Sequence, residues 1–307
     1  MSGVLAAVTT LVLVALAGHV AGRAGVLHVE DRHALARIVF SVAMPALLFA
    51  TVAGSDPRDL FSGVLIAHTA GLLAAALLYL VPSLLRRRGS EETVIGTLSV
   101  SYVNVGNLGI PLTGYVLGDV TVVAPVLLLQ LLIMSPVAFL VLDGRRHGHS
   151  GWPPGWLAGM FRNPLIVATL LGLAVALWDV SVPEFVLHPV ELIAGAAVPL
   201  ALLAYGLSLG ASGSALPPSV SPAHVAFVTM LKVVVHPLVA GLVGWGILGL
   251  EGTTLLAATL LAALPTAQNV HAVALRYGSA EPLARAAVLA TTVAAVPVLV
   301  LASALLA

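Results

Sequence analysis

Long apolar stretches follow one another along almost the whole chain, and short polar segments separate them. A helix needs about 20 mostly apolar residues to cross the hydrocarbon core of a membrane. Ten stretches meet this requirement, and in chain order they cover residues 3–22, 34–54, 60–82, 92–118, 120–142, 163–178, 187–210, 222–249, 252–276 and 283–306. The pattern therefore predicts an all-α integral membrane protein with ten transmembrane helices, numbered 1 to 10 below.

The composition agrees with this pattern and excludes several classes of protein. Hydrophobic residues make up 60% of the chain and charged residues 8%, whereas soluble domains average about 45–50% and about 25%. The chain has no cysteine and a formal net charge of zero, so disulfides and a general attraction to nucleic acid are not expected. No hydrolase, zinc-protease or P-loop motif occurs, and we expect neither an enzyme nor a cofactor.

The basic residues predict the orientation of the chain. Arginines in loops are expected on the cytoplasmic side. If both termini lie outside, eleven of the 13 basic residues fall in inner loops; these are Arg23, Arg32, Arg37, Arg86, Arg87, Arg88, Arg145, Arg146, Arg162, Arg276 and Arg285. Arg58 is then the outer arginine, and Lys232 lies within helix 8. We expect a protein of the cytoplasmic membrane with both termini outside.

The chain divides into two halves of similar sequence. Residues 143–162 form a short basic segment at its middle, which we expect to be a cytoplasmic linker between residues 1–142 and 163–307. Two proline pairs, Pro45 with Pro199 and Pro111 with Pro265, share one spacing in corresponding helices. Since each half holds five helices, an odd number, the second repeat is expected to be inverted relative to the first, as in many transporters.

Helix 4 is interrupted by polar and helix-breaking residues at what would be mid-membrane depth. Asn104, Gly106, Asn107 and Pro111 lie within ten residues of one another. Glycine and proline both disfavour a continuous helix. Unpaired backbone groups in hydrocarbon cost several kcal/mol each, so a break is expected only where protein or a water-filled cavity covers it.

Helix 9 carries a matching interruption at Pro265, Thr266, Gln268 and Asn269, followed by His271. Paired interruptions in corresponding helices are typical of a transporter binding site near the membrane midplane. We therefore expect these residues to bind substrate together with those of helix 4. The alternative is that each interruption is a packing kink with hydrogen bonds between helices.

Lys232 is the one charged residue placed deep within a predicted helix, and no carboxylate lies at comparable depth. A charge in this position suggests a functional site. Its partner could be backbone carbonyls, an amide or an anionic substrate, or the side chain could extend to the membrane surface. His236, four residues later, lies on the same face, and His236 and His271 are candidates for a proton relay.

Other polar side chains within the predicted helices give weaker signals. His19 and His68 could also carry protons, although a packing role is more common for such residues. Gln130 in helix 5 and Ser208 in helix 7 are expected to form hydrogen bonds between helices.

Three segments resemble a known family, the auxin efflux carriers. They are Asn104 to Pro111 (NVGNLGIP), Lys232 to Pro237 (KVVVHP), and Leu264 to Asn269 (LPTAQN), which Arg276-Tyr277-Gly278 follows. That family includes the plant PIN carriers and bacterial carriers of dicarboxylates such as malonate and malate. The resemblance implies that broken helices 4 and 9 cross near mid-membrane. It also implies a scaffold of helices 1, 2, 6 and 7, and a transporter domain of helices 3–5 and 8–10 that makes an elevator-like movement.

We therefore expect a secondary transporter that moves a small organic anion, such as a mono- or dicarboxylate or an auxin-like acid, by alternating access. One alternative is a sodium-coupled symporter, similar to the bile-acid symporters, with a neutral or amphipathic substrate. A more remote alternative is a membrane receptor or enzyme without transport. Besides substrate and lipid, a second copy of the chain is a candidate partner, since helices 2 and 7 offer apolar faces.

Overall fold

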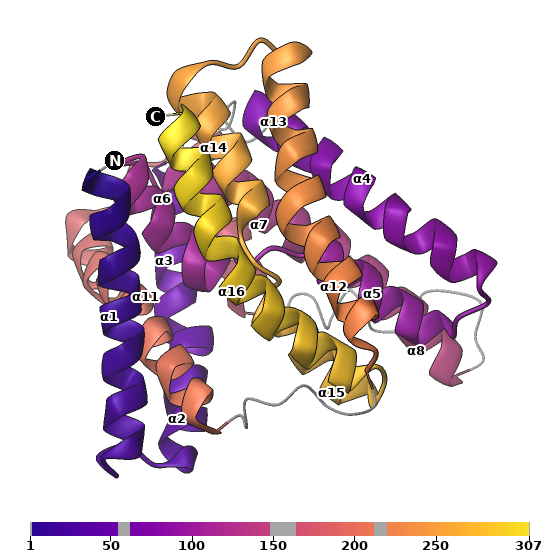
Figure 1. The fold of residues 1–307 in the computed structure, drawn as a ribbon. Coiled ribbons are helices and arrows are strands. Elements are labelled where there is room, and N and C mark those ends of the chain that lie inside the picture. The colour runs from indigo at the N-terminus through magenta and orange to yellow at the C-terminus, as the bar shows by residue number, and fades with distance from the viewer. Residues whose placement is uncertain (1, 55–61, 148–163, 212–219, 307) are drawn as a thin grey trace.

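The computed structural model describes residues 2–54, 62–147, 164–211 and 220–306, and the described residues are helical apart from turns and two short extended segments. Figure 1 shows the helices running roughly alongside one another, with the N- and C-termini at the same end of the molecule. Five helices among the described residues are long and apolar enough to cross a membrane by themselves. The all-helical prediction is confirmed.

One group of helices packs around α1 (Ser2–Arg23) and α11 (Glu184–Ala211). The two backbones come very close, because a Cβ added at Gly18 or Gly206 would collide with the backbone of the opposite helix. Small residues allow such approaches between membrane helices. In the same group, α3 (Met44–Ala53) packs on α10 (Pro164–Leu177) and on α11.

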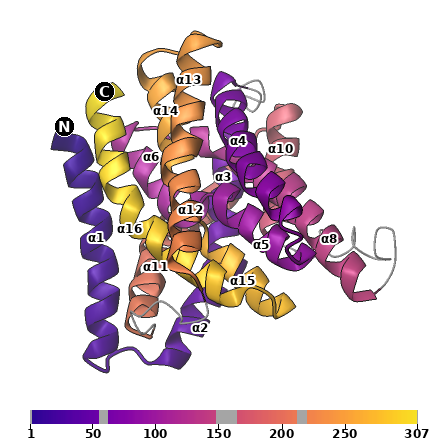
Figure 2. The same cartoon turned by 45° about the vertical axis from the view of Figure 1, so that its right-hand side comes forward.

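A second group lies beside the first, as Figures 1 and 2 show. Its long members are α4 (Gly63–Leu85), α13 (His236–Gly246), α14 (Gly252–Ala263) and α16 (Glu281–Leu306). Both α4 and α14 pack on α13, and α16 packs on α14. Gly71 of α4 lies so close to the α13 backbone at His236 that a side chain there would collide.

Two of the expected spans are each divided into two helices. The fourth consists of α5 (Ser90–Ser101), the π-helical segment η3 (Val105–Gly109) and α6 (Ile110–Val116). The ninth consists of α14 and α15 (Gln268–Tyr277). The non-helical residues between the halves are 102–104 and 264–267, called the first arm and the second arm below.

Four π-helical segments each end two residues before a proline. They are η1 (Val39–Ala43) before Pro45, η3 before Pro111, η5 (Leu129–Met134) before Pro136, and η6 (Leu231–Val235) before Pro237. Proline has no backbone N–H, and its ring clashes with the carbonyl four residues earlier. A wider turn ahead of the proline relieves that clash, so the chain bulges instead of breaking.

Some expected boundaries were wrong by several residues. The helix that contains η5 continues as α8 (Ser135–His147), five residues into the expected linker, whose remaining residues mostly lie outside the described ones. Similarly, α2 (Val29–Ile38) begins five residues before the predicted helix 2. In both cases polar residues continue a helix beyond its apolar stretch, because backbone hydrogen bonding does not depend on contact with hydrocarbon.

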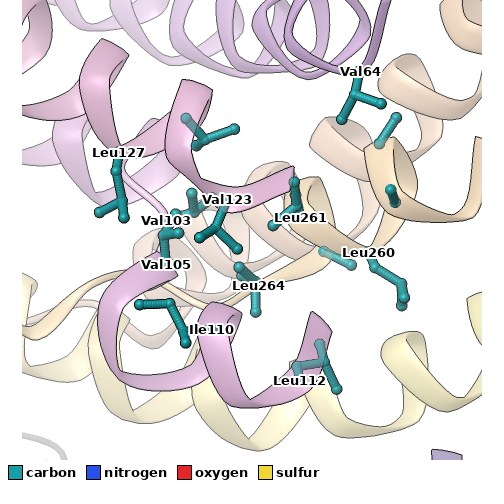
Figure 3. Close-up of a cluster of buried hydrophobic side chains, with 14 of the residues drawn as sticks. Val64, Val103, Val105, Ile110, Leu112, Val123, Leu127, Leu260, Leu261 and Leu264 are labelled. Carbon is teal, nitrogen blue, oxygen red and sulfur yellow. The ribbon is translucent and has the colours of Figure 1, made fainter. Parts of the chain in front are cut away.

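The main hydrophobic core surrounds the two arms. Figure 3 shows Val103 of the first arm and Val105 of η3 close to Val123, and Leu264 of the second arm close to Leu261. Val103 and Leu264 are both fully buried. The breaks are therefore enclosed by protein rather than exposed to lipid, as unpaired backbone in a membrane requires.

Candidate functional site

The two arms meet in a single antiparallel β-bridge between Val103 and Thr266. The Asn104 N–H donates to the Pro265 carbonyl at 2.8 Å, and the Ala267 N–H donates to the Tyr102 carbonyl at 3.0 Å. Each arm therefore satisfies backbone groups that the other arm leaves without helical partners. We call this pair of arms the crossing.

Neutral side chains complete the first arm. The Gln130 amide, from η5, donates to the Val103 carbonyl at 3.0 Å. This bond confirms the prediction that Gln130 bonds to another segment. The Asn104 side chain is 4% exposed and accepts a 3.3 Å bond from the Asn107 N–H, so it caps the helix that begins at η3. Gly106 lies in the first turn of this segment, against the Met44 side chain of the other helix group.

Hydroxyl groups complete part of the second arm. The Thr266 N–H donates to Thr291 Oγ1 of α16 at 3.0 Å, and Thr266 Oγ1 donates to the Ser99 carbonyl of α5 at 2.6 Å. These two bonds tie the arm to two different helices. Pro265 has no N–H to satisfy, which suits a residue at this break.

Lys232 is fully buried in η6 and reaches the end of α14. Its Nζ donates to the Ala262 carbonyl at 3.0 Å and lies 3.1 Å from His236 Nδ1. The last four carbonyls of a helix have no intrahelical donor, and the C-terminal end of its dipole attracts cations. Of the partners considered from the sequence, the structure shows a backbone carbonyl, and the side chain does not extend to the surface.

His236 links Lys232 to α4. Its Nε2 lies 3.3 Å from the His68 carbonyl, and the His68 and His236 rings are 4.8 Å apart. Both rings are fully buried. Among the described residues, neither ring nitrogen of His68 has a hydrogen-bond partner. Three titratable side chains thus form one buried cluster beside the crossing.

The remaining predicted residues lie on the helices that leave the crossing. Gln268 and Asn269 occupy the first turn of α15, with Gln268 half-buried and Asn269 exposed. Pro111 lies buried in the first turn of α6. His271, also on α15, is half-buried and lies on a different element from the Lys232–His236 pair.

Sequence reasoning missed the residues that position the arms through single hydroxyl groups. Tyr102, Thr291 and Ser135 are the main examples: the Tyr102 hydroxyl lies 3.1 Å from Ser135 Oγ and also hydrogen-bonds with the Asn269 side chain. Serine and threonine are common in membrane helices and usually bond to their own backbone. The adjacent Thr291 and Thr292 lie within one predicted helix, and the sequence does not show which of them faces the break.

The crossing presents two kinds of helix end. At the C-terminal end of α14 the Ala262 carbonyl is occupied by Lys232, and in the first arm the Val103 carbonyl is occupied by Gln130. In contrast, η3 and α15 both begin here, and the first N–H groups of a helix lack intrahelical acceptors. Two positive dipole ends, with amide side chains nearby, favour an anionic ligand over a cation.

Comparison with known proteins agrees with this chemistry. The profile of a family described as "Membrane transport protein" matches residues 3–151 and 156–303. A Rhizobium meliloti (strain 1021) protein named "Putative malonate transporter" is 28% identical over 267 residues, covering 83% of this chain and 81% of that protein. An "Uncharacterized transporter" of Methanothermobacter thermautotrophicus (strain ATCC 29096 / DSM 1053 / JCM 10044 / NBRC 100330 / Delta H) is 29% identical over 266 residues, covering 85% and 84%.

The family profile spans nearly the whole length of the chain, apart from a short gap in the middle. A match of that extent cannot come from a shared motif or a single helix. The protein therefore belongs to the membrane transport protein family of the auxin efflux carriers, and it is a carrier rather than an enzyme.

Proposed function

We propose that this carrier moves a small organic anion, a mono- or dicarboxylate or an auxin-like acid, across the cytoplasmic membrane by alternating access. The observation that carries the proposal is the crossing, where η3 and α15 both begin next to the paired arms and a helix start favours an anion. The relative named for malonate supports a dicarboxylate as the first substrate to test.

In this proposal the substrate carboxylate lies against the first turns of η3 and α15. The side chains of Asn107, Gln268 and Asn269 orient it, while Asn104 holds the η3 turn in place. Backbone groups around Gly106, Pro111, Pro265 and Thr266 shape the site. Asn104 is almost fully buried, whereas Asn269 is exposed, which supports a positioning role for the first and a contact role for the second.

Lys232 supports an anion carrier over a sodium symporter. Coupling cations in transporters bind at unwound carbonyls and at the C-terminal ends of half-helices. At the end of α14, Lys232 Nζ donates to the Ala262 carbonyl, so a side-chain donor already occupies a position where sodium would bind.

Proton coupling is the second part of the proposal. His236 contacts both Lys232 and His68, so a proton gained by this cluster would change the charge beside the crossing. His271 lies on α15, which follows the second arm, whereas the Lys232 cluster contacts α14, which precedes it. His271 is therefore a separate candidate for a proton relay.

The architecture that we infer is two inverted repeats of five helices, residues 1–142 and 163–307. The two interrupted helices and the packing of helices into two groups support it. The group of α1, α3, α10 and α11 would be the fixed scaffold and the remaining helices the moving part. Both termini lie at one end, as an even number of spans requires, and we propose that this end is outside.

The test is uptake of radiolabelled malonate by the purified protein in proteoliposomes. Asn107→Ala and Gln268→Ala should each reduce uptake about tenfold or more, since a lost hydrogen bond to a charged ligand costs about 1.5–3 kcal/mol. The matched control is Thr254→Ala, because Thr254 is exposed and lies ten residues, about 15 Å along α14, before the break.

Ion gradients distinguish the coupling schemes in the same vesicles. An imposed pH gradient should drive uptake, and His236→Phe should abolish that dependence while leaving exchange of internal for external malonate. Uptake that requires sodium would favour the symporter alternative. Equal uptake by the two amide variants and Thr254→Ala would contradict a substrate site at the crossing.

A further inference from the structure

A cavity with basic and aromatic lining residues lies at the arginine-bearing end of α4, away from the crossing. It has a volume of about 540 Å³ and separates the C-terminal end of α4 from the N-terminal end of α12 (Pro222–Met230). Arg86, Arg88, Ser221 and His224 contribute its polar lining, and Tyr79 and Phe227 its aromatic lining. Neither the crossing nor the Lys232 cluster contributes to this lining.

The cavity carries a surplus of positive charge. Arg88 Nη1 bonds to Glu92 Oε1 at 2.6 Å, which neutralises one guanidinium. Arg86 is exposed, and among the described residues no acidic side chain pairs with it. The first turn of α12 adds a positive dipole end, since no side chain caps the helix at Ser221.

The walls of the cavity are fixed by contacts among its own residues. The His224 ring stacks on Tyr79 at 5.8 Å with an angle of 8° between planes, and the Tyr79 hydroxyl lies 3.0 Å from His224 Nε2. Arg88 Nη1 lies 3.1 Å from His224 Nδ1. Behind Tyr79 the α5 backbone is close enough that a Cβ at Gly96 would collide with the phenol ring.

An exposed apolar stripe leads from this cavity toward the middle of the membrane. Phe227 lines the cavity, and Met230, Val234 and Leu238 follow it at spacings of three or four residues on the same run of helix. These three are 48%, 48% and 57% exposed. Because η6 interrupts the α-helical phase between Met230 and Leu238, their exposure rather than their spacing places them on the outer surface of this helix.

We propose that this cavity binds an anionic membrane lipid, with the phosphate between Arg86, Arg88 and His224 and an acyl chain along the apolar stripe. Basic pockets between transmembrane helices are suited to phosphate headgroups. A soluble phosphate or carboxylate would meet the same charges but would gain nothing from the stripe. The continuity of basic cavity and apolar stripe therefore points to a lipid.

The test is native mass spectrometry of the purified, delipidated protein titrated with phosphatidylglycerol. Phosphatidylcholine is the neutral lipid control, and glycerol 3-phosphate and malonate are the soluble anion controls. Arg86→Gln should weaken phosphatidylglycerol binding about fivefold, the contribution of one arginine near a membrane surface. The matched variant is Arg87→Gln, because Arg87 is the exposed neighbour that removes the same charge but does not line the cavity.

Three outcomes decide the proposal. Tighter binding of phosphatidylglycerol than phosphatidylcholine, weakened by Arg86→Gln and unchanged in Arg87→Gln, supports it. Equal losses in the two arginine variants would show a diffuse surface attraction and overturn it, as would glycerol 3-phosphate or malonate competing as strongly as the lipid. Met230→Asp interrupts the stripe and leaves the basic residues intact. It should weaken the binding of phosphatidylglycerol and leave the binding of the soluble anions unchanged. Transport is not measured, so the result is independent of the malonate experiment.

Discussion

The two arms of the crossing pair with each other through one β-bridge but have different chemical supports. The first arm is completed by neutral amides, Gln130 on the Val103 carbonyl and Asn104 on the following turn. The second arm is held by two threonine hydroxyls, and the buried Lys232 side chain donates to the end of α14 just before that arm. Two broken helices that pair with each other can therefore be supported by different side-chain chemistry.

The largest effect is expected from removing the Lys232 side chain. Lys232→Met leaves the buried Ala262 carbonyl without its donor, and an unsatisfied buried acceptor costs about 1–3 kcal/mol. We expect a lower Tm by circular dichroism and at least about tenfold slower malonate uptake in proteoliposomes. Lys232→Arg keeps a donor and a charge and should recover part of both. Wild-type uptake and Tm in Lys232→Met would remove the lysine from stability and mechanism alike.

A smaller effect is expected at the first arm. Gln130→Leu removes the donor to the Val103 carbonyl, but that carbonyl also accepts the Val105 N–H at 2.9 Å. A hydrogen bond between membrane helices contributes about 1 kcal/mol, so the free energy of unfolding should fall less than in Lys232→Met. Thermal unfolding of the two variants side by side is the measurement. If Gln130→Leu costs as much as Lys232→Met, the contrast between the arms is wrong.

The smallest effect is expected from a pair of adjacent threonines. Thr291 Oγ1 accepts the Thr266 N–H, whereas the Thr292 hydroxyl bonds to the Val288 carbonyl of its own helix. Thr291→Val should lower the free energy of unfolding by about 0.6 kcal/mol, and Thr292→Val should leave it nearly unchanged. Equal behaviour of the two valine variants would show that the second arm does not need its hydroxyl support.

The positions of both breaks could be anticipated from the sequence, because proline, glycine and amides at mid-membrane depth leave few alternatives. The bond from Gln130 to another helix could be anticipated as well, because a buried amide needs a partner. The partner of Lys232 could not, since every residue has a backbone carbonyl and the sequence does not mark which one is free. The β-bridge between Val103 and Thr266 is equally hidden, because residues 163 positions apart carry no local signal of their pairing.

The π-helical segments ahead of the prolines have a consequence for helix phase. Each one adds a residue to a helix without adding a turn, which rotates everything beyond it by about 100° relative to an unbroken α-helix. Lys232, Gln130 and Asn107 all lie within such segments, at the points where the rotation occurs. A helical wheel drawn through Pro237 would therefore assign the wrong face to one half of that span. Deleting a single residue from 231–235 could restore a regular helix and, in doing so, turn α12 away from its neighbours.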